Sequence, residues 1–155
     1  MAKFTFRAQA ALDLRQREYE HTQRELAQRQ RDLQSAQAAL RTAEEAVTLA
    51  QRTTADARTA MAPAYELEWY RFWIERLVHE RQAHTQQVTA REQRVAEAIA
   101  ACHRAHQRCE ALLRFRDKAR RAFDAAESAT ERKLIDELAT RRYTAGRVAR
   151  GEYTS

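Results

Sequence analysis

The sequence predicts an all-α protein, a long antiparallel two-helix coiled-coil hairpin with an overhanging C-terminal helix. A strict period of seven is the first reason, because it keeps one stripe of a helix facing a partner helix. Composition is the second: the chain has only 2 glycines and 1 proline, and 32% of its residues are charged, as is typical of long helices. The residues of the period are Leu12, Tyr19, Leu26, Leu33, Leu40 and Val47.

One internal break divides the chain. Pro63 is the only proline, and both glycines, Gly146 and Gly151, lie near the C-terminus. Proline is tolerated in the first turn of a helix, where its missing N–H costs nothing. We therefore expect a hairpin over residues 1–143, and its parts are a first helix at about 4–60, a turn at 61–64 and a second helix at about 65–143. A flexible basic tail should follow at 144–155.

The heptad pattern also predicts the register of the hairpin. If the chain folds back at residue 62, facing residues have numbers that sum to 124, and the two stripes of each helix meet as an antiparallel coiled coil requires. Tyr19 then faces Ala105, and large side chains mostly meet small ones, which fills the seam without voids. Polar residues interrupt the seam at Arg91 and His84, which weakens it and helps to fix its register.

The two helices are unequal in length. The first helix begins near residue 4, which faces residue 120 in this register. About 20 residues of the second helix therefore continue unpaired, roughly 30 Å at 1.5 Å per residue. This overhang, residues 121–143, carries Phe123, Leu134, Ile135 and Leu138. A lone helix with a short apolar stripe is poorly stabilised in water. We expect a partner to hold it.

An aromatic segment, residues 65–74, follows the proline. Leu67, Tyr70 and Ile74 fall on the seam of the predicted hairpin. A second stripe lies outside the seam and consists of Tyr65, Trp69, Phe72 and Trp73. It fits an apolar cap around the turn or a self-association patch; it equally fits a docking stripe for another protein, because exposed aromatic residues mark interfaces.

Other chemistry finds little support. Cys102, His106 and Cys109 share a helical face, but one straight helix holds the two sulfurs too far apart for a zinc site. We expect no metal, no cofactor and no catalytic site, since no nucleophile and base can converge on two helices. The basic residues mostly alternate with acidic ones, as on a solvated coiled-coil face, so we expect no nucleic acid.

The charge and hydropathy of the chain bound its location. The net charge is +6 and the pI is near 9.8, an excess that suits an acidic protein surface, anionic lipid or nucleic acid. No apolar run approaches the ~20 residues that span a bilayer, and no signal peptide is recognisable at the start. We expect a cytoplasmic protein, and docking on a membrane complex stays open.

Three segments resemble the FliJ family, small components of the bacterial flagellar type III export apparatus. The first is Phe4-x-Phe6-Arg7 followed by Leu12-x-Leu14-Arg15. The others are Tyr70-x-x-Trp73-Ile74-x-x-Leu77 and Glu131-x-Lys133-x-x-Asp136-Glu137-x-Ala139. The order of these segments, with the chain length and the predicted hairpin, carries the resemblance.

The resemblance implies a non-enzymatic stalk. In that family an antiparallel two-helix rod inserts the end bearing both termini into the hexameric ring of the export ATPase, promotes its assembly and activity, contacts the membrane export gate and helps to recycle export chaperones. In that family an aromatic residue and a leucine after the turn are tied to the gate contact, and they match Trp73 and Leu77 here. We extend this expected gate-binding set to the neighbouring Trp69 and Phe72. The residues expected to bind the ATPase ring are Phe4, Phe6, Arg7, Arg15, Phe123, Lys133, Leu134, Asp136 and Leu138.

Two alternatives stay open at this stage. The chain could be the equivalent stalk of a virulence type III secretion system. From a different class, it could be a basic coiled-coil protein that binds nucleic acid or a membrane surface, and binding that collapses with modest salt would favour that class.

Overall fold

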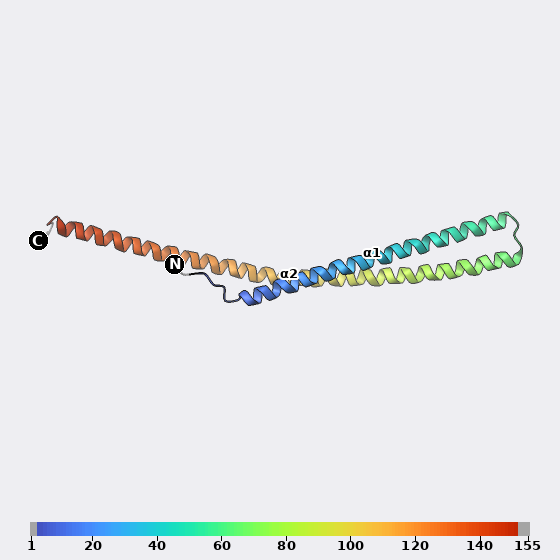
Figure 1. Cartoon of the computed structure of the whole chain (residues 1–155), viewed down its shortest axis with the longest axis horizontal. Coiled ribbons are helices and arrows are strands. Elements are labelled where there is room, and N and C mark those ends of the chain that lie inside the picture. Colours follow the sequence, from blue (N-terminus) through green and yellow to red (C-terminus); the bar gives the residue numbers. More distant parts are fainter. Residues whose placement is uncertain (1–2, 152–155) are drawn as a thin grey trace. The chain divides into compact units, whose positions relative to one another are not determined.

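The computed structural model describes residues 3–151, and Figure 1 shows that they form two helices, α1 (Gln9–Thr59) and α2 (Ala64–Ala149). No strand occurs among these described residues. The two helices pack against each other as a helical hairpin, so the predicted fold class is confirmed.

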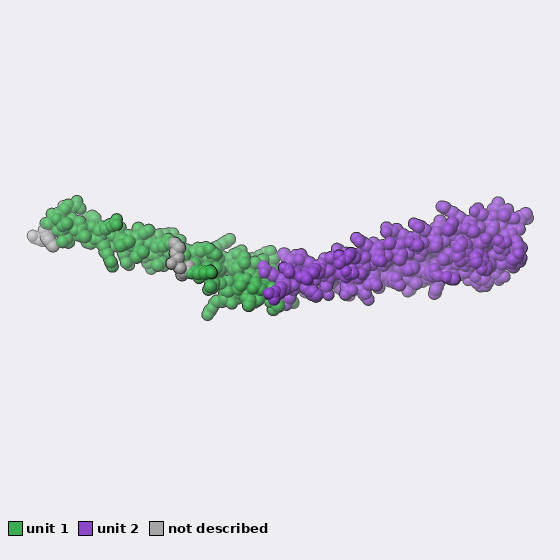
Figure 2. Space-filling view, viewed as in Figure 1, with its two compact units in different colours: residues 1–14, 108–155 green, residues 15–107 purple. Residues whose placement is uncertain are grey.

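The chain divides into two compact units, which Figure 2 colours separately. One unit comprises residues 1–14 and 108–155, and we call it the terminal unit. The other comprises residues 15–107 and contains the turn, and we call it the hairpin unit.

The turn between the helices is closed by backbone hydrogen bonds. The N–H of Ala62 donates to the carbonyl of Ala57 at 3.0 Å, and the N–H of Met61 donates to the carbonyl of Arg58 at 3.1 Å. Met61 has a φ of 55°, so this is a Schellman ending with a left-handed residue at the position that glycine usually takes. Pro63 follows, and its carbonyl accepts from the N–H groups of Glu66 and Leu67 at 3.0 and 3.2 Å. Proline therefore precedes the first residue of α2 and needs no N–H there.

The core of the hairpin unit lies on the predicted seam. Val47 is 2% exposed, Ala50 is fully buried and Ala105 is 7% exposed. Thr54 is also buried, and its hydroxyl donates to the carbonyl of Ala50 at 2.7 Å. Burying this hydroxyl is inexpensive because its hydrogen bond is made within the same helix.

Contacts across the hairpin unit agree with the predicted register. An Arg91 nitrogen lies 3.7 Å from an Asp32 carboxylate oxygen, and the rings of Tyr19 and His106 lie 5.0 Å apart between centroids. The residue numbers of both pairs sum to within one of the predicted 124. Asp32 also explains how Arg91 is tolerated beside the seam, since its charge has a partner on the other helix.

The start of α1 differs from the prediction. The helix begins at Gln9 rather than near residue 4, and residues 3–6 have no regular secondary structure. Phe4-Thr5-Phe6 consists of residues that lose side-chain freedom in a helix, and the two rings instead pack on α2. Within the terminal unit the Phe4 ring pairs with Phe123, and the Phe6 ring pairs with Phe115.

The end of α2 also differs. The helix continues to Ala149 instead of ending near residue 143, so residues 144–149, which were expected in the flexible tail, are helical. This segment has no proline and a single glycine, Gly146, which weakens a helix without ending it. The end comes where Gly151 adopts a φ of 68°, a conformation that glycine reaches without steric cost. The remaining tail, residues 152–155, lies outside the described residues.

Candidate functional site

An aromatic surface lies on α2 just after the turn, and we define it as Tyr65, Trp69, Phe72 and Trp73. Tyr65 is 77% exposed, Trp69 59% and Phe72 56%, whereas Trp73 is half-buried. The first three rings thus stand outside the seam, as the heptad analysis predicts. Exposed aromatic side chains of this size, on a helix face with charged neighbours, are typical anchors at protein interfaces.

Three rings of this surface, those of Trp69, Phe72 and Trp73, contact neighbouring side chains. Trp69 stacks on Trp73 at 5.6 Å between centroids and meets Tyr70 edge-on at 5.3 Å. The guanidinium of Arg71 lies 5.1 Å from the centre of the Phe72 ring. Ordered rings lose less side-chain entropy when a partner binds, so the local packing favours a docking role.

Leu77 and Trp73 differ from the rest of the predicted gate-binding set. Leu77 is half-buried on the seam, and Trp73 contacts the half-buried Tyr70 at 6.1 Å between centroids. Both residues therefore contribute to the packing of the hairpin unit, and a substitution at either would change stability together with any docking.

The terminal unit contains a second aromatic cluster, formed between the N-terminal segment and α2. Phe4 and Phe123 lie 5.5 Å apart between ring centroids, and Phe6 and Phe115 lie 5.7 Å apart. Arg120 places its guanidinium 5.4 Å from the centre of the Phe4 ring. The structure therefore brings together three of the residues predicted to bind the ATPase ring, and Phe115 and Arg120 join them.

Beyond this cluster the overhang of α2 has no intrachain cover. The sequence predicts an unpaired stretch from residue 121, but Phe123 packs on Phe4, so the uncovered stretch begins later. All residues from 128 to 145 are exposed, and we use the word overhang for this stretch from here on. It includes four predicted site residues, Lys133, Leu134, Asp136 and Leu138, of which Leu134 is 58% and Leu138 50% exposed. Neighbouring Ile135 is 63% exposed. An apolar stripe that faces water along a helix is an available surface for another protein.

The two predicted arginines lie in different surroundings. Arg7 is exposed in the turn that precedes α1. Arg15 belongs to the hairpin unit, where its guanidinium is 2.7 Å from a carboxylate oxygen of Glu18. Arg15 is thus already partnered within its own helix, and the structure gives it no evident role in binding.

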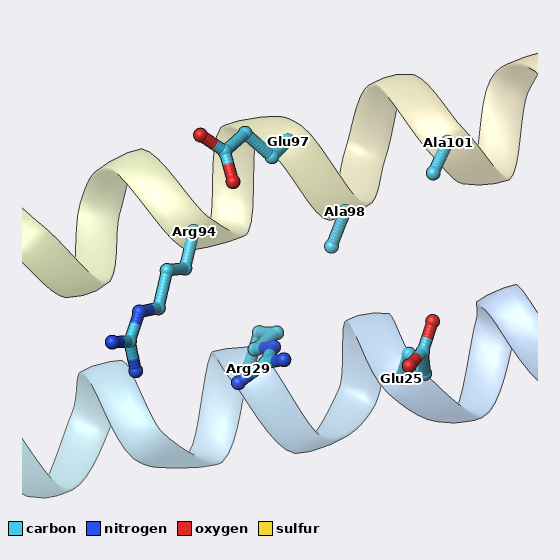
Figure 3. A pocket seen from close by; sticks show the side chains of 6 residues that line it. All are labelled: Glu25, Arg29, Arg94, Glu97, Ala98 and Ala101. Atoms are coloured by element: carbon cyan, nitrogen blue, oxygen red, sulfur yellow. The ribbon is translucent and has the colours of Figure 1, made fainter.

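The hairpin unit has a groove between its helices that the sequence analysis does not predict. It has a volume of about 540 Å³, and Figure 3 shows Ala98 and Ala101 of α2 opposite the charged residues Glu25 and Arg29 of α1. Its lining consists of Glu25, Arg29, Arg94, Glu97, Ala98 and Ala101. Two acidic and two basic residues leave it without a preferred ligand charge, and it holds no nucleophile.

The cysteine and histidine residues form no metal centre among the described residues. No group of three or more possible ligands comes together there. Cys102 is half-buried and Cys109 is buried, both as free thiols. The ring of His106 packs on Tyr19 at 5.0 Å between centroids, so packing accounts for this histidine.

Membrane insertion by a helix finds no support in the part of the chain that the structure describes. Neither α1 nor α2 contains a segment with the length and apolar character needed to cross a bilayer.

Comparison with known proteins identifies the family. The sequence model of a family described as "Flagellar FliJ protein" matches residues 5–147, which is nearly the whole chain. No curated protein and no solved structure matches the chain significantly. FliJ proteins are non-catalytic components of the flagellar export apparatus. The chain belongs to the FliJ family and is a component of that apparatus.

Proposed function

We propose that this chain is the stalk that couples the flagellar export ATPase to the membrane export gate. Its terminal unit binds inside the hexameric ATPase ring and promotes ring assembly and activity. Its aromatic surface binds the cytoplasmic part of the export gate. Export chaperones are recycled on the same protein, which works in the cytoplasm at the inner face of the membrane.

The overhang is the observation that carries the ATPase part of the proposal. A helix stretch with Leu134, Ile135 and Leu138 each at least half exposed gains stability only when another surface covers it. Burying one such side chain contributes about 1.5–3 kcal/mol. A ring lumen surrounds a helix on all sides, and this suits a stretch in which every residue from 128 to 145 is exposed.

The aromatic surface supports a second and separate contact. It lies in the hairpin unit, whereas the overhang lies in the terminal unit. No residue is shared between the two surfaces. One chain can therefore contact two partners at once, as coupling of the ATPase to the gate requires.

Deletion of residues 128–155 tests the ATPase contact. The deleted stretch contains no buried residue among those described, so the truncated chain should keep its helicity and its hairpin unit. We expect it to lose stimulation of the purified ATPase and assembly of the ring. The full-length variant Arg132→Ala is a matched control, because it changes the overhang without touching its apolar stripe, and it should stimulate normally. Full stimulation by the truncated chain would refute the ATPase part of the proposal.

A further inference from the structure

Four residues of the overhang form a stripe whose two halves mirror each other. Glu131, Leu134, Leu138 and Arg141 are separated by three, four and three residues. At 3.6 residues per turn these spacings place all four side chains within an arc of about 80° on one helix face. All four are exposed, and we call them the palindromic stripe.

The symmetry of the stripe has a chemical consequence. The midpoint between Leu134 and Leu138 is residue 136, and the midpoint between Glu131 and Arg141 is residue 136 as well. If two such helices run antiparallel about a two-fold axis that passes the stripe at the level of residue 136, each Leu134 meets a Leu138 of the other copy. Each Glu131 then meets an Arg141, so the apolar centre is flanked by two ion pairs.

The charged ends of the stripe form no ion pair with another residue between 3 and 151. The ion pairs that α2 forms in the terminal unit are Arg114–Glu110, Arg116–Asp117 and Arg120–Asp124, and all of them precede the overhang. Among the described residues Glu131 and Arg141 thus remain without an opposite charge. Both charges are free to pair with another molecule.

We propose that the palindromic stripe is a self-association surface through which two copies of this chain pair antiparallel. A parallel pair would set Glu131 beside Glu131 and Arg141 beside Arg141, and like charges at facing positions disfavour it. An antiparallel pair satisfies both charges in each copy, and the interface is isologous, as in most homodimers. Ile135, 63% exposed beside the two leucines, adds apolar area close to the axis.

The proposed dimer follows from the palindromic stripe alone and does not depend on the proposed function. Its consequence rests on the proposed function: Leu134 and Leu138 are also expected to bind the ATPase ring, so a copy in the dimer cannot enter the ring. Self-association would then hold the chain in an inactive dimer, and binding to an available ATPase ring would replace the contact with the second copy.

Charge reversal on the full-length chain tests the pairing. Glu131→Arg and Arg141→Glu each turn two attractive contacts of the homodimer into two repulsive ones. We expect each variant alone to associate about tenfold or more weakly than the unmodified chain, a loss of about 1.4 kcal/mol or more, because both exposed ion pairs become repulsive. A one-to-one mixture of the two variants restores both ion pairs, and so does the double variant Glu131→Arg/Arg141→Glu. Sedimentation velocity over a concentration series measures the association.

Matched controls carry the same charge changes on the opposite helix face. Asp136→Arg and Arg132→Glu lie about half a turn from the stripe, and both should associate like the unmodified chain. All these side chains are exposed, so the variants should keep their helicity, which circular dichroism checks.

Three outcomes would overturn the proposal. The unmodified chain could remain monomeric at every concentration, or the dimer could tolerate both reversals, or the one-to-one mixture could fail to pair. A monomeric chain that still stimulates the ATPase through Leu134 and Leu138 would reject the dimer while it supports the proposed function. A dimer that behaves as expected in a chain that fails to stimulate the ATPase would do the reverse.

Discussion

Phe4 packs its ring against that of Phe123, 5.5 Å away between centroids, although Phe4 lies outside any helix. Phe6 makes the same kind of contact with Phe115. An irregular N-terminal segment thus continues the cover of α2 beyond the start of α1. In the terminal unit this segment replaces the helical turn that the sequence predicts there.

Phe4→Ala should loosen this cover without unfolding the hairpin unit. The substitution removes one aromatic pair and a cation–π contact with Arg120, together about 1–2 kcal/mol. Hydrogen exchange of residues 3–14 should become faster, while exchange near Val47 stays unchanged. Thr5→Ala, an exposed neighbour, is the control and should leave both regions as they are. If residues 3–14 exchange at the same rate in Phe4→Ala and in the unmodified chain, the ring pair does not stabilise the N-terminal segment.

The register of the hairpin unit predicts a specific crosslink. Cysteines introduced by Leu26→Cys and Ala98→Cys should form an intramolecular disulfide, because the two positions face each other in the register supported by Asp32 and Arg91. The experiment needs a background in which Cys102 and Cys109 are replaced by alanine. Mass spectrometry under non-reducing conditions identifies the bond.

A pair shifted by one heptad, Leu33→Cys with Ala98→Cys, is the control for that crosslink. It should remain reduced, since cysteines with Cα atoms more than about 7 Å apart cannot be bridged without backbone movement. Oxidation of the shifted pair in preference to the first pair would mean that the register is displaced.

Met61→Gly should stabilise the protein. A non-glycine residue in the left-handed conformation costs about 1–2 kcal/mol, and Met61 has a φ of 55° with a side chain that is 90% exposed. Little packing is lost on its removal, so we expect a gain of about 1 kcal/mol after the greater freedom of the unfolded glycine is subtracted. Thermal unfolding measures it.

Ala60→Gly is the neighbouring control, because residue 60 does not have a positive φ. Glycine there gains nothing in the folded state and adds freedom to the unfolded state, so the melting temperature should fall. If the melting temperature falls for both variants, the left-handed conformation of Met61 does not destabilise the protein.

Trp69→Ala should weaken binding to the export gate with little loss of fold stability. The indole is 59% exposed, and loss of a central aromatic anchor can cost ~2 kcal/mol or more of binding, roughly thirtyfold in affinity. Leu49→Ala is the matched control, since Leu49 is also exposed, at 62%, and lies in the hairpin unit but on α1. Titration against the cytoplasmic part of the gate, beside thermal unfolding, separates docking from packing. Unchanged affinity with a lowered melting temperature would make Trp69 a packing residue.

The seam could be predicted from the sequence because heptad spacing fixes which side chains face a partner helix. Val47 and Ala50 are buried where the pattern put them, and Asp32–Arg91 agrees with the register. The same arithmetic placed Trp69 and Phe72 outside the seam. A periodic pattern predicts only features that follow the helical repeat. The seam, the register and the residues outside the seam all follow it.

The remaining features depend on contacts that no period encodes. Phe4 and Phe6 leave the helix because α2 offers rings at Phe123 and Phe115, a tertiary effect that local propensity does not contain. The groove at Ala98 exists because small residues on α2 leave space beside Arg29. From the sequence, residues 144–149 are expected in a flexible tail, but the helix continues through Gly146, and the glycine with a positive φ is Gly151.

The short turn at Met61 also bears on how the hairpin unit assembles. Residues next to the turn, such as Ala57 and Leu67, are close in sequence, so their contact requires little loop closure, whereas Tyr19 and His106 are separated by most of the unit. Assembly should therefore begin at the turn and proceed along the seam, because each new layer closes only a short additional loop. A substitution at Ala57 would then slow folding, and one at Tyr19 would mainly speed unfolding.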